Sequence, residues 1–451
     1  MSDRIVIVGA GFSGTLLAIN MLRSDGPPIT LIEREPFAGT GLAYGAAHPS
    51  HLLNVRAANM SAFHDEPGHF REWVAGQDLD LGPNPFVPRL TYGRYLRDLL
   101  AAAVAGSAGR LTLAQGEAVR IARTAGGARV DLADGSSLEA GTAVLSVGNL
   151  PPHAPPGIDE SVLQRSAYAG DPWAADALEG LGDDATVLAL GTGLTMVDVA
   201  LALRARGFGG RIVAMSRRGL LPHAHADAPP APDKLNEKPR ETGAALVRRI
   251  RKRAAAIGWR AAIDELRPFT QDMWRGAGDR GRARFLQHAR PWWDIHRHRL
   301  APDVAAIIAE MRGSGALQPR AGKTISVEAV PEGAAVTWRS RGSDTPEVLV
   351  ATRIINCTGP QGDLLRADEP LLRSLVAEGA IRPDPLRIGI DVDLQSRTIA
   401  ADGTANDWLY ALGPMTRGAF WEIVAVPDIR VQSWSIARRL TNSQWVGGEG
   451  L

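Results

Sequence analysis

Two short glycine-containing segments have the spacing of turns that bind phosphate groups. The first, GAGFSG (9–14), follows the apolar run IVIV and opens a helical pattern. One glycine permits a tight turn, the second lets the backbone approach a pyrophosphate, and the third lets helix and strand pack closely. The start of the helix then attracts negative charge. Glu33 ends the next apolar run, where a carboxylate binds the ribose hydroxyls of adenosine. These residues predict a dinucleotide site.

The second segment, GTGLTM (191–196), has Met196 where the third glycine usually stands. The strand that follows it ends in Ser216, Arg217 and Arg218 rather than in a carboxylate. A carboxylate would repel a 2′-phosphate, whereas a hydroxyl and guanidinium groups would bind it. We therefore expect NADPH at this turn. NADH is the alternative, because neither arginine has to point inward.

Two such turns imply two dinucleotides. The pairing with the simplest chemistry is a resident FAD on the first turn and an exchanging NAD(P)H on the second, with hydride passing from the nicotinamide to the flavin. The residues expected to bind FAD here are Gly9, Gly11, Phe12, Ser13, Gly14, Glu33 and Arg34. Those expected to bind NAD(P)H are Gly191, Gly193, Leu194, Thr195, Ser216, Arg217 and Arg218.

The surrounding elements indicate an α/β protein with two Rossmann-like dinucleotide-binding domains, the second inserted in the first. Continuous apolar runs such as IVIV are typical of parallel strands covered on both faces, and proline-rich segments separate the units. The expected divisions are 1–170 for the first part of the FAD domain and 180–350 for the NAD(P)H domain, with a helical insertion at about 225–313. The second part of the FAD domain is expected at 351–445.

Composition narrows the function. The 451 residues carry a net charge of +1, which does not favour nucleic acid, and no apolar run is long enough to span a membrane. IVIVGAG is too short and too rich in glycine for a signal peptide. The single cysteine, Cys357, excludes an intramolecular disulfide and a dithiol–disulfide reductase, and it fits a cytoplasmic protein. The H-x-H pairs in HAHAD and HRHR lack a third ligand, so we expect no metal.

Several longer segments resemble a known family. TGLAYGAAHPSHLLNVRAANMSAF, FVPRLTYGRYL, LGTGLTMVD with SRRGLLP, IHRHRLAP, INCTGP and LYALGPMTRGAFWEIVAVPDIR resemble the bacterial FAD/NAD(P)-binding family of FAD-dependent urate hydroxylases and aspartate N-monooxygenases. The resemblance implies that NAD(P)H reduces FAD, that O2 adds to flavin C4a, and that the hydroperoxide hydroxylates a bound substrate. One departure is Gly413-Pro414, where a common FAD motif has Gly-Asp. A ribityl contact at Gly413 must then come from backbone N–H groups or from a neighbour.

Within this resemblance, the loop SHLLNVRAANMSAF is expected beside the flavin ring, with His51, Asn54 and Met60 as flavin contacts; a purely structural loop is the alternative. The candidate catalytic residues are Arg417, Glu422 and Arg297. Arg417 would bind an anionic substrate or stabilise reduced flavin, whereas Glu422 is equally well explained as an ion-pair partner. Trp274, Trp292 and Trp293 are expected in the core, with a substrate-pocket wall as the sharper alternative.

The expected function is an FAD-dependent, NAD(P)H-consuming monooxygenase that uses O2 on a small polar or anionic substrate. Urate hydroxylation is the leading choice and aspartate-type N-hydroxylation the second. The alternatives are an NAD(P)H:acceptor oxidoreductase that inserts no oxygen and a flavin redox sensor without catalysis. A homo-oligomer is compatible with the sequence.

Overall fold

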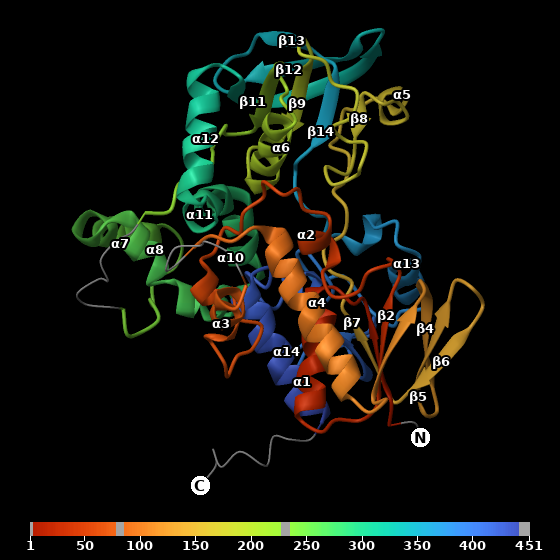
Figure 1. The fold of residues 1–451 in the computed structure, drawn as a ribbon. Helices are drawn as coiled ribbons and strands as arrows, with labels where there is room; N and C mark the ends of the chain where they lie inside the picture. The colour runs from red at the N-terminus through yellow and green to blue at the C-terminus, as the bar shows by residue number, and fades with distance from the viewer. Residues whose placement is uncertain (1–2, 78–84, 227–234, 442–451) are drawn as a thin grey trace.

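The computed structural model describes residues 3–77, 85–226 and 235–441. Two domains, each built on a largely parallel sheet, lie one above the other in Figure 1, and a group of helices lies beside their junction. Both ends of the chain contribute to the lower domain, whose sheet contains strands from the first 145 residues and from residues after 396. The second domain is therefore inserted in the first.

The first domain contains a six-stranded sheet in the order β15-β16-β7-β1-β2-β3. All neighbouring pairs are parallel except β15 with β16. The strands are β1 (Ile5–Val8), β2 (Ile29–Glu33), β3 (Leu111–Gln115), β7 (Thr142–Leu145), β15 (Arg397–Ile399) and β16 (Ala405–Ala411).

Strand β1 is apolar throughout because both faces of this sheet are covered. Ile5 and Ile7 pack with the helices on one face, and Val6 and Val8 pack with the elements on the other. The first face carries α1 (Phe12–Arg23), α4 (Arg89–Gly106) and α14 (Val426–Leu440). The second carries the antiparallel strands β4 (Ala118–Thr124), β5 (Gly127–Leu132) and β6 (Ser137–Ala140), and helix α13 (Pro370–Ala377). Such double coverage is the rule for parallel sheets.

The second domain contains a seven-stranded sheet in the order β13-β12-β11-β10-β9-β14-β8. The strands are β8 (Tyr168–Ala169), β9 (Thr186–Leu190), β10 (Arg211–Ser216), β11 (Leu317–Val330), β12 (Gly333–Ser340), β13 (Pro346–Ala351) and β14 (Arg353–Asn356). Pairs from β8 to the start of β11 are parallel, and β11, β12 and β13 form an antiparallel meander. Helices α6 (Leu194–Ala205) and α12 (Pro302–Gly313) cover one face, and α5 (Glu160–Leu163) packs on the other.

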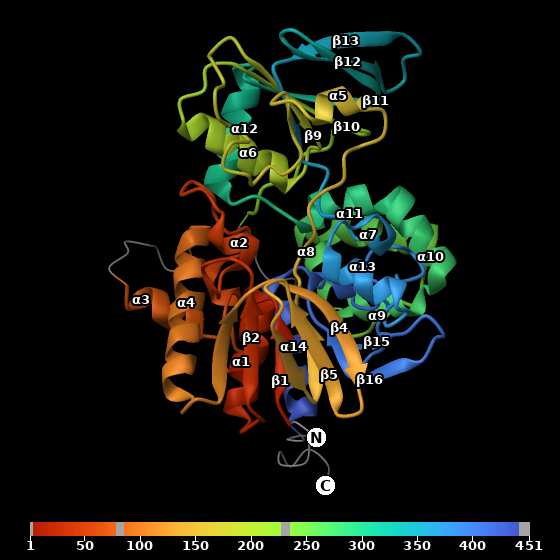
Figure 2. The same ribbon diagram turned by 90° about the vertical axis from the view of Figure 1, so that its right-hand side faces the viewer.

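The helical insertion is fastened to the first domain. It consists of α7 (Gly243–Ile257), α8 (Trp259–Asp264), α9 (Thr270–Gly276), α10 (Gly278–Arg284) and α11 (Arg290–Arg297), with short turns η2 (Arg267–Phe269) and η3 (Phe285–Ala289). Figure 2 shows these helices grouped on one side of the junction. The Trp274 ring stacks on Trp421 with centroids 4.5 Å apart, and Trp274 Nε1 donates to the Gly418 oxygen. The insertion therefore reaches the loop that follows the last strand of the first domain.

Short elements complete the first domain. They are α2 (Gly41–Gly45), η1 (Ala57–Asn59), α3 (His69–Ala75), η4 (Leu364–Arg366) and η5 (Pro414–Thr416).

The fold class predicted from the sequence is confirmed, but two expected divisions are displaced. Tyr168 pairs with Ile354, and Arg353 pairs with Val187, so β8 and β14 both belong to the second sheet. The first domain therefore does not extend to 170 and does not resume at 351. An apolar run that ends in a glycine turn looks the same in either parallel sheet, so composition did not assign β14. Residues 227–234 of the expected insertion and 442–445 of the last division lie outside the described residues.

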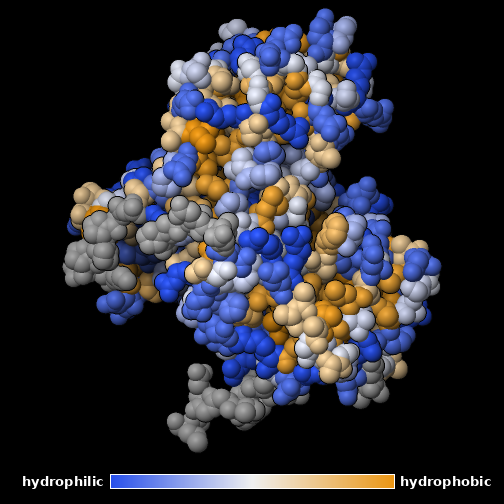
Figure 3. Space-filling model, in the orientation of Figure 1, coloured by the Kyte–Doolittle hydropathy of each residue, from blue (hydrophilic) through white to orange (hydrophobic). Residues whose placement is uncertain are grey.

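The surface of the face drawn in Figure 3 is mostly hydrophilic, with apolar residues in separate small patches. Among residues 3–77, 85–226 and 235–441, no helix has the length and apolar character that a bilayer span requires.

Candidate functional site

In the first turn, close backbone packing requires two of the three glycines. Gly9 has φ +100°, and a Cβ there would lie 2.4 Å from the Ser146 oxygen. A Cβ on Gly14 would lie 2.0 Å from the Gly9 oxygen, so α1 packs too closely for any side chain. The first N–H groups of α1 have no acceptors within the helix and can therefore bind phosphate oxygens.

The other residues expected around this turn differ in where their side chains lie. Glu33 Oε2 accepts a hydrogen bond from the Ala10 N–H at 2.9 Å, so the carboxylate lies at the turn. Phe12 is buried in the core, so its backbone rather than its ring faces the turn. Arg34 is half-exposed and pairs with Glu369 at 3.0 Å. The bond to Glu369 uses Nη1, and the other N–H groups of Arg34 are left for a cofactor contact.

Gly413 meets the first turn from the last strand of the sheet. It has φ +85°, and a Cβ there would lie 2.6 Å from Ser13 Oγ. Its N–H donates to Gln432 Oε1 at 2.9 Å, and the Gln432 amide donates to Thr416 Oγ1. A ribityl contact at Gly413 would therefore have to replace the bond to Gln432.

The residues around the first turn fit a dinucleotide. Ser146 follows β7 and lies beside Gly9, and its buried Oγ has no hydrogen-bond partner among the described residues. A buried hydroxyl without a partner is uncommon and indicates a ligand that supplies one. Together with the close-packed glycines and the Glu33 carboxylate, Ser146 makes a polar cradle for a pyrophosphate and ribose.

The second turn resembles the first in the positive φ of its first glycine, and space is free around its second glycine. Gly191 has φ +124°, and a Cβ there would lie 2.2 Å from the Cys357 oxygen. Around Gly193, by contrast, a Cβ would meet no atom within 4 Å. Leu194 and Thr195 are half-buried at the start of α6, and Met196 is fully buried in the domain core. Met196 thus packs inward and leaves the phosphate-binding backbone open.

The end of β10 supplies the polar residues beside the second turn. Ser216 Oγ lies 2.9 Å from Thr192 Oγ1 and accepts from the Gly219 N–H at 3.0 Å. Arg217 is exposed and Arg218 is half-buried directly after Ser216. These residues stand where this fold binds the 2′ position of the adenosine ribose.

The three expected flavin contacts of the loop after α2 lie in different surroundings. Met60 is 2% exposed inside the core, so its side chain has no surface that a flavin could contact. His51 is buried and bonds through Nε2 to the Asp198 oxygen of α6 at 2.9 Å. Asn54 lines the cavity described next, and its backbone oxygen accepts a hydrogen bond from His225 Nε2 at 3.0 Å. For His51 and Met60 the structural alternative is the better description.

A cavity of about 1060 Å³ lies between the insertion and the first domain. Among the described residues, eight arginines and three aspartates line it. The arginines are Arg56, Arg260, Arg267, Arg275, Arg297, Arg299, Arg430 and Arg439, and the aspartates are Asp264, Asp272 and Asp428. Each aspartate already pairs with one arginine: Asp264 with Arg299, Asp272 with Arg275 and Asp428 with Arg267. The lining therefore retains positive charge that an anionic ligand would neutralise.

Glu422 contacts two arginines of this cavity lining, Arg297 and Arg267. Its carboxylate accepts from Trp293 Nε1 at 2.6 Å and from Arg297 Nε at 3.3 Å, and it lies 3.6 Å from Arg267 Nη1. The residue is buried and adopts φ +65°. Burial also lowers the pKa of Arg297, partly opposed by the charge of Glu422. Glu422 is thus an ion-pair partner, which was one of the two roles that the sequence allowed. It orients Arg297, which lines the cavity.

Arg417, the third candidate, does not line the cavity. Its Nε donates to the Pro414 oxygen at 3.0 Å and its Nη2 to Asn149 Oδ1 at 3.0 Å. Pro414 and Asn149 follow the adjacent strands β16 and β7, so Arg417 lies at the carboxyl ends of the first sheet. Burial lowers the pKa of Arg417 to about 10. A cation there, bonded only to neutral groups in the described chain, suits an anionic group of a cofactor.

The tryptophans of the insertion do not line the cavity. Trp274 is buried, Trp293 bonds to Glu422, and Trp292 is exposed. Among the described residues, no group of three or more His, Cys, Asp or Glu side chains is arranged to hold a metal ion. Asp227 of HAHAD lies outside the described residues. Cys357 is buried, and burial raises the pKa of its thiol, so it is unsuited to nucleophilic chemistry.

Sequence reasoning missed the pairing of Arg267 with Asp428 and of Arg89 with Asp198. Arg267 donates to both carboxylate oxygens of Asp428, across the junction of the insertion and α14. Arg89 Nη2 lies 2.9 Å from Asp198 Oδ2, across the two domains. The one available signal was Asp198, an acid within the otherwise apolar run of α6.

Comparison with known protein families matches the part of the chain that contains the first glycine turn. Residues 6–150 match a family described as FAD-NAD(P)-binding. No curated protein sequence matches the chain.

Several solved structures that share the overall fold are amine monooxygenases. An ornithine N-hydroxylase from Kutzneria sp. 744, with reduced FAD, NADP+ and L-ornithine, shares 15% identity over 98% of this chain and 100% of its own, with a TM-score of 0.63. An L-lysine 6-monooxygenase from Pseudomonas syringae shares 16% over 98% and 100%, with a TM-score of 0.63. An FAD-bound cadaverine monooxygenase from Erwinia amylovora shares 12% over 98% and 95%, with a TM-score of 0.64.

At these identities the likeness shows the fold. None of these three structures is a urate hydroxylase, so the leading substrate expected from the sequence gains no support. The chain therefore has the fold of flavoproteins that bind two dinucleotides, and its first segment matches an FAD-NAD(P)-binding family.

Proposed function

We propose that this protein is an FAD- and NADPH-dependent monooxygenase that hydroxylates the amino nitrogen of a small anionic substrate, with an acidic amino acid of the aspartate type as the best candidate. The observation that carries the proposal is an arginine-rich cavity in a protein that also has two dinucleotide turns. Gln432 lines this cavity and accepts the Gly413 N–H, and Gly413 lies against Ser13 of the first turn. Two successive contacts, Gln432 with Gly413 and Gly413 with Ser13, thus connect the cavity lining to the first turn.

The charge of the cavity favours an acid over a diamine. Arg297 pairs with Glu422 rather than with an aspartate of the lining, and Arg430 donates to the Ser61 oxygen. Their remaining N–H groups can bind a carboxylate, which guanidinium groups hold with two parallel hydrogen bonds. A diamine such as cadaverine would meet like charges there. An amino acid with a second carboxylate would satisfy the arginines and present its amine.

In this proposal the chain's own groups position the substrate and exclude water. When bound, the nicotinamide would donate the hydride, and the flavin would accept it and activate oxygen; side chains cannot provide this chemistry. Arg297, oriented by Glu422, binds a substrate carboxylate. Phe420, Ile423 and Ile436 line the same cavity and keep part of it dry, which limits the loss of activated oxygen to water.

The test is NADPH consumption by the FAD-loaded protein in air, with hydrogen peroxide measured at the same time. L-Aspartate, urate, L-ornithine and cadaverine are compared with no addition. L-Aspartate is expected to accelerate NADPH consumption, to lower the peroxide formed per NADPH, and to yield a product heavier by one oxygen atom. Coupled turnover of urate would identify a ring hydroxylase instead. Peroxide equal to NADPH with every compound would refute the proposed substrates and favour a flavin oxidoreductase with another acceptor.

A further inference from the structure

Asp198 is a buried carboxylate at the junction of the two domains. It lies in the first half of α6, four residues after the helix begins at Leu194, and only 7% of its side chain is exposed. Arg89, at the start of α4 in the first domain, donates from Nη2 to Oδ1 at 3.2 Å, and the same nitrogen lies 2.9 Å from Oδ2. The second glycine turn and this ion pair therefore belong to the same short stretch of chain.

His51 holds the backbone of the same residue. Its Nδ1 accepts from the His48 N–H at 3.1 Å, so the proton of the neutral ring is on Nε2, which donates to the Asp198 oxygen at 2.9 Å. Burial and the charge of Arg89 lower the pKa of His51 to about 4. The ring is therefore neutral at physiological pH and keeps this hydrogen-bond direction.

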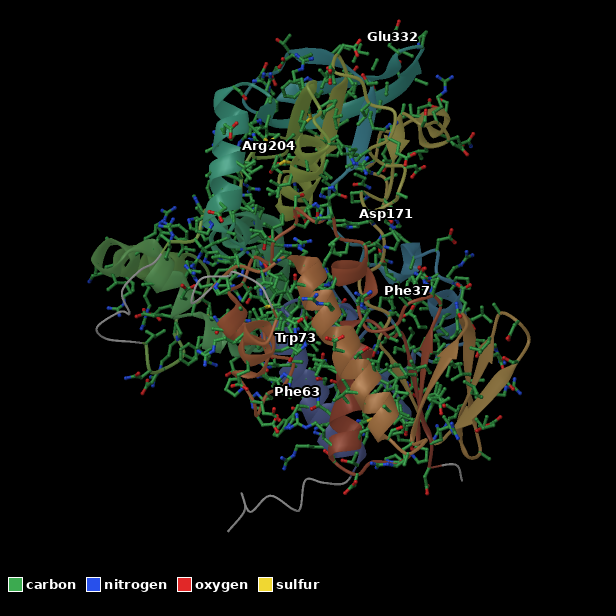
Figure 4. The ribbon with its side chains drawn as sticks, viewed as in Figure 1. Phe37, Phe63, Trp73, Asp171, Arg204 and Glu332 are labelled. Atoms are coloured by element: carbon green, nitrogen blue, oxygen red, sulfur yellow. The ribbon has the colours of Figure 1, made fainter. Side chains whose placement is uncertain are left out.

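The two groups that hold Asp198 are themselves rigidly joined. Leu52 and Pro88 form an antiparallel bridge, and the Arg89 N–H donates to the His51 oxygen at 2.9 Å. Trp173 approaches the His51 ring edge-on at 5.8 Å. Asp171, labelled in Figure 4 between the two domains, accepts the Trp173 N–H at 2.9 Å. This support in the first domain thus contacts Asp198 through its side chain and its backbone, and Trp173 beside it.

We propose that Asp198 is a positioning residue: held by Arg89 and His51, it sets the second glycine turn, and a nicotinamide dinucleotide bound there, against the first domain. The effect of Asp198 on hydride transfer rests on the proposed function. The effect of Asp198 on the orientation of the two domains does not. A buried ion pair adds little net stability, and in some proteins its role is instead to favour one geometry. Because this pair lies near the N-terminus of α6, it fixes the direction from which the dinucleotide approaches the first domain.

The orientation is measured by electron spin resonance distances between two spin labels on the full-length protein. Ala102→Cys on α4 and Ala205→Cys at the end of α6 place the labels at exposed positions, and the native Cys357 is buried. We expect a narrow distance distribution in this background. Asp198→Asn and Asp198→Leu should broaden or shift it, whereas Asp303→Asn, an exposed acid on α12, should not.

The chemical consequence is measured as the rate of flavin reduction by NADPH without oxygen. Asp198→Asn should lower that rate roughly tenfold or more while the NADPH dissociation constant changes less than about threefold. Arg89→Lys retains the charge and should recover part of the rate lost in Arg89→Met. FAD content and melting temperature of each variant show whether it is folded.

The rate should also depend on pH in a way that Asp198→Asn abolishes. Burial raises the pKa of Asp198 to about 6, against the opposing charge of Arg89. The other titratable groups that face it are the neutral His51 and the buried Cys357 thiol. The ion pair is complete above this pKa, so the wild-type rate should rise through about pH 6 and that of Asp198→Asn should not.

The distance measurement decides the inference. Unchanged distributions in both Asp198 variants would overturn it, because other contacts would then set the domain angle. Altered distances with an unchanged reduction rate would overturn its chemical consequence. A wild-type protein that NADPH does not reduce would refute the proposed function, and the distances would still show whether Asp198 sets the domain geometry.

Discussion

At the scale of single residues, Glu422 combines two features that oppose stability. It adopts φ +65°, a conformation that residues other than glycine rarely adopt, and its carboxylate is buried. Backbone strain of this kind costs on the order of 1–3 kcal/mol and is concentrated at functional sites. Trp293, Arg297 and Arg267 surround the carboxylate and compensate its burial. Glu422 thus holds a cation in place at the wall of the cavity.

Removing the charge of Glu422 should release Arg297 without removing the cofactor. In Glu422→Gln we expect the KM for the acidic substrate to rise about tenfold or more, since a carboxylate-oriented arginine contributes on the order of 1.5–3 kcal/mol to binding. Reduction of the flavin by NADPH alone should stay near the wild-type rate, which separates a positioning role from a general loss of structure.

Glu378→Gln is the matched control, because Glu378 pairs with Arg120 at the surface, outside the cavity lining. It should leave both measurements unchanged. Equal KM values for wild type and Glu422→Gln would contradict the role assigned to Glu422.

At the scale of elements, the sequence predicted what is local. The glycine turn, helix and acidic residue of the first site lie within one strand–helix–strand unit, so their spacing carries the geometry. Arg56, Arg297 and Arg430 come from a loop, an insertion helix and the last long helix, and spacing cannot bring such residues together. The same limit explains why the predicted flavin contact of Met60 does not fit its burial in the core. A loop beside a site has a buried side and an open side, and the sequence does not show on which side each residue lies.

Because α1 packs closely on the first turn, substitution of Gly14 tests this local geometry directly. Because a Cβ there would lie 2.0 Å from the Gly9 oxygen, Gly14→Ala must displace the helix. We expect a loss of stability of about 2 kcal/mol or more, as for other overpacked sites, and purification with little bound FAD. The measurements are thermal unfolding and the visible flavin spectrum.

Gly106→Ala provides the comparison, since it also lies in a helix of the first domain and a Cβ there meets nothing within 4 Å. It should bind FAD as wild type does and be equally or slightly more stable. Full FAD content in Gly14→Ala would contradict the assignment of the first turn to the cofactor.

At the scale of the whole molecule, charge is unevenly distributed. The chain has a net charge of only +1, yet eight arginines and three aspartates of its described residues line one cavity where the insertion meets the first domain. The insertion brings five of those arginines: Arg260, Arg267, Arg275, Arg297 and Arg299. Stacking of Trp274 on Trp421 and the pairing of Arg267 with Asp428 hold it there. The insertion thus creates a local positive field in a nearly neutral protein.

This local field predicts how salt should act on substrate binding. Because exposed charges are screened over about 10 Å at 0.1 M salt, raising NaCl from about 0.05 M to about 0.5 M should raise the KM for the acidic substrate several-fold. In Arg430→Met the KM should be higher at low salt and rise less steeply, since one lining cation is gone. Arg438→Met is the control, because Arg438 lies on the same helix over Trp434 and outside the cavity lining. If the two arginine variants show the same KM and salt dependence, the acid binds elsewhere. If only Arg430→Met differs from wild type, the cavity between the insertion and α14 is where the substrate carboxylate is held.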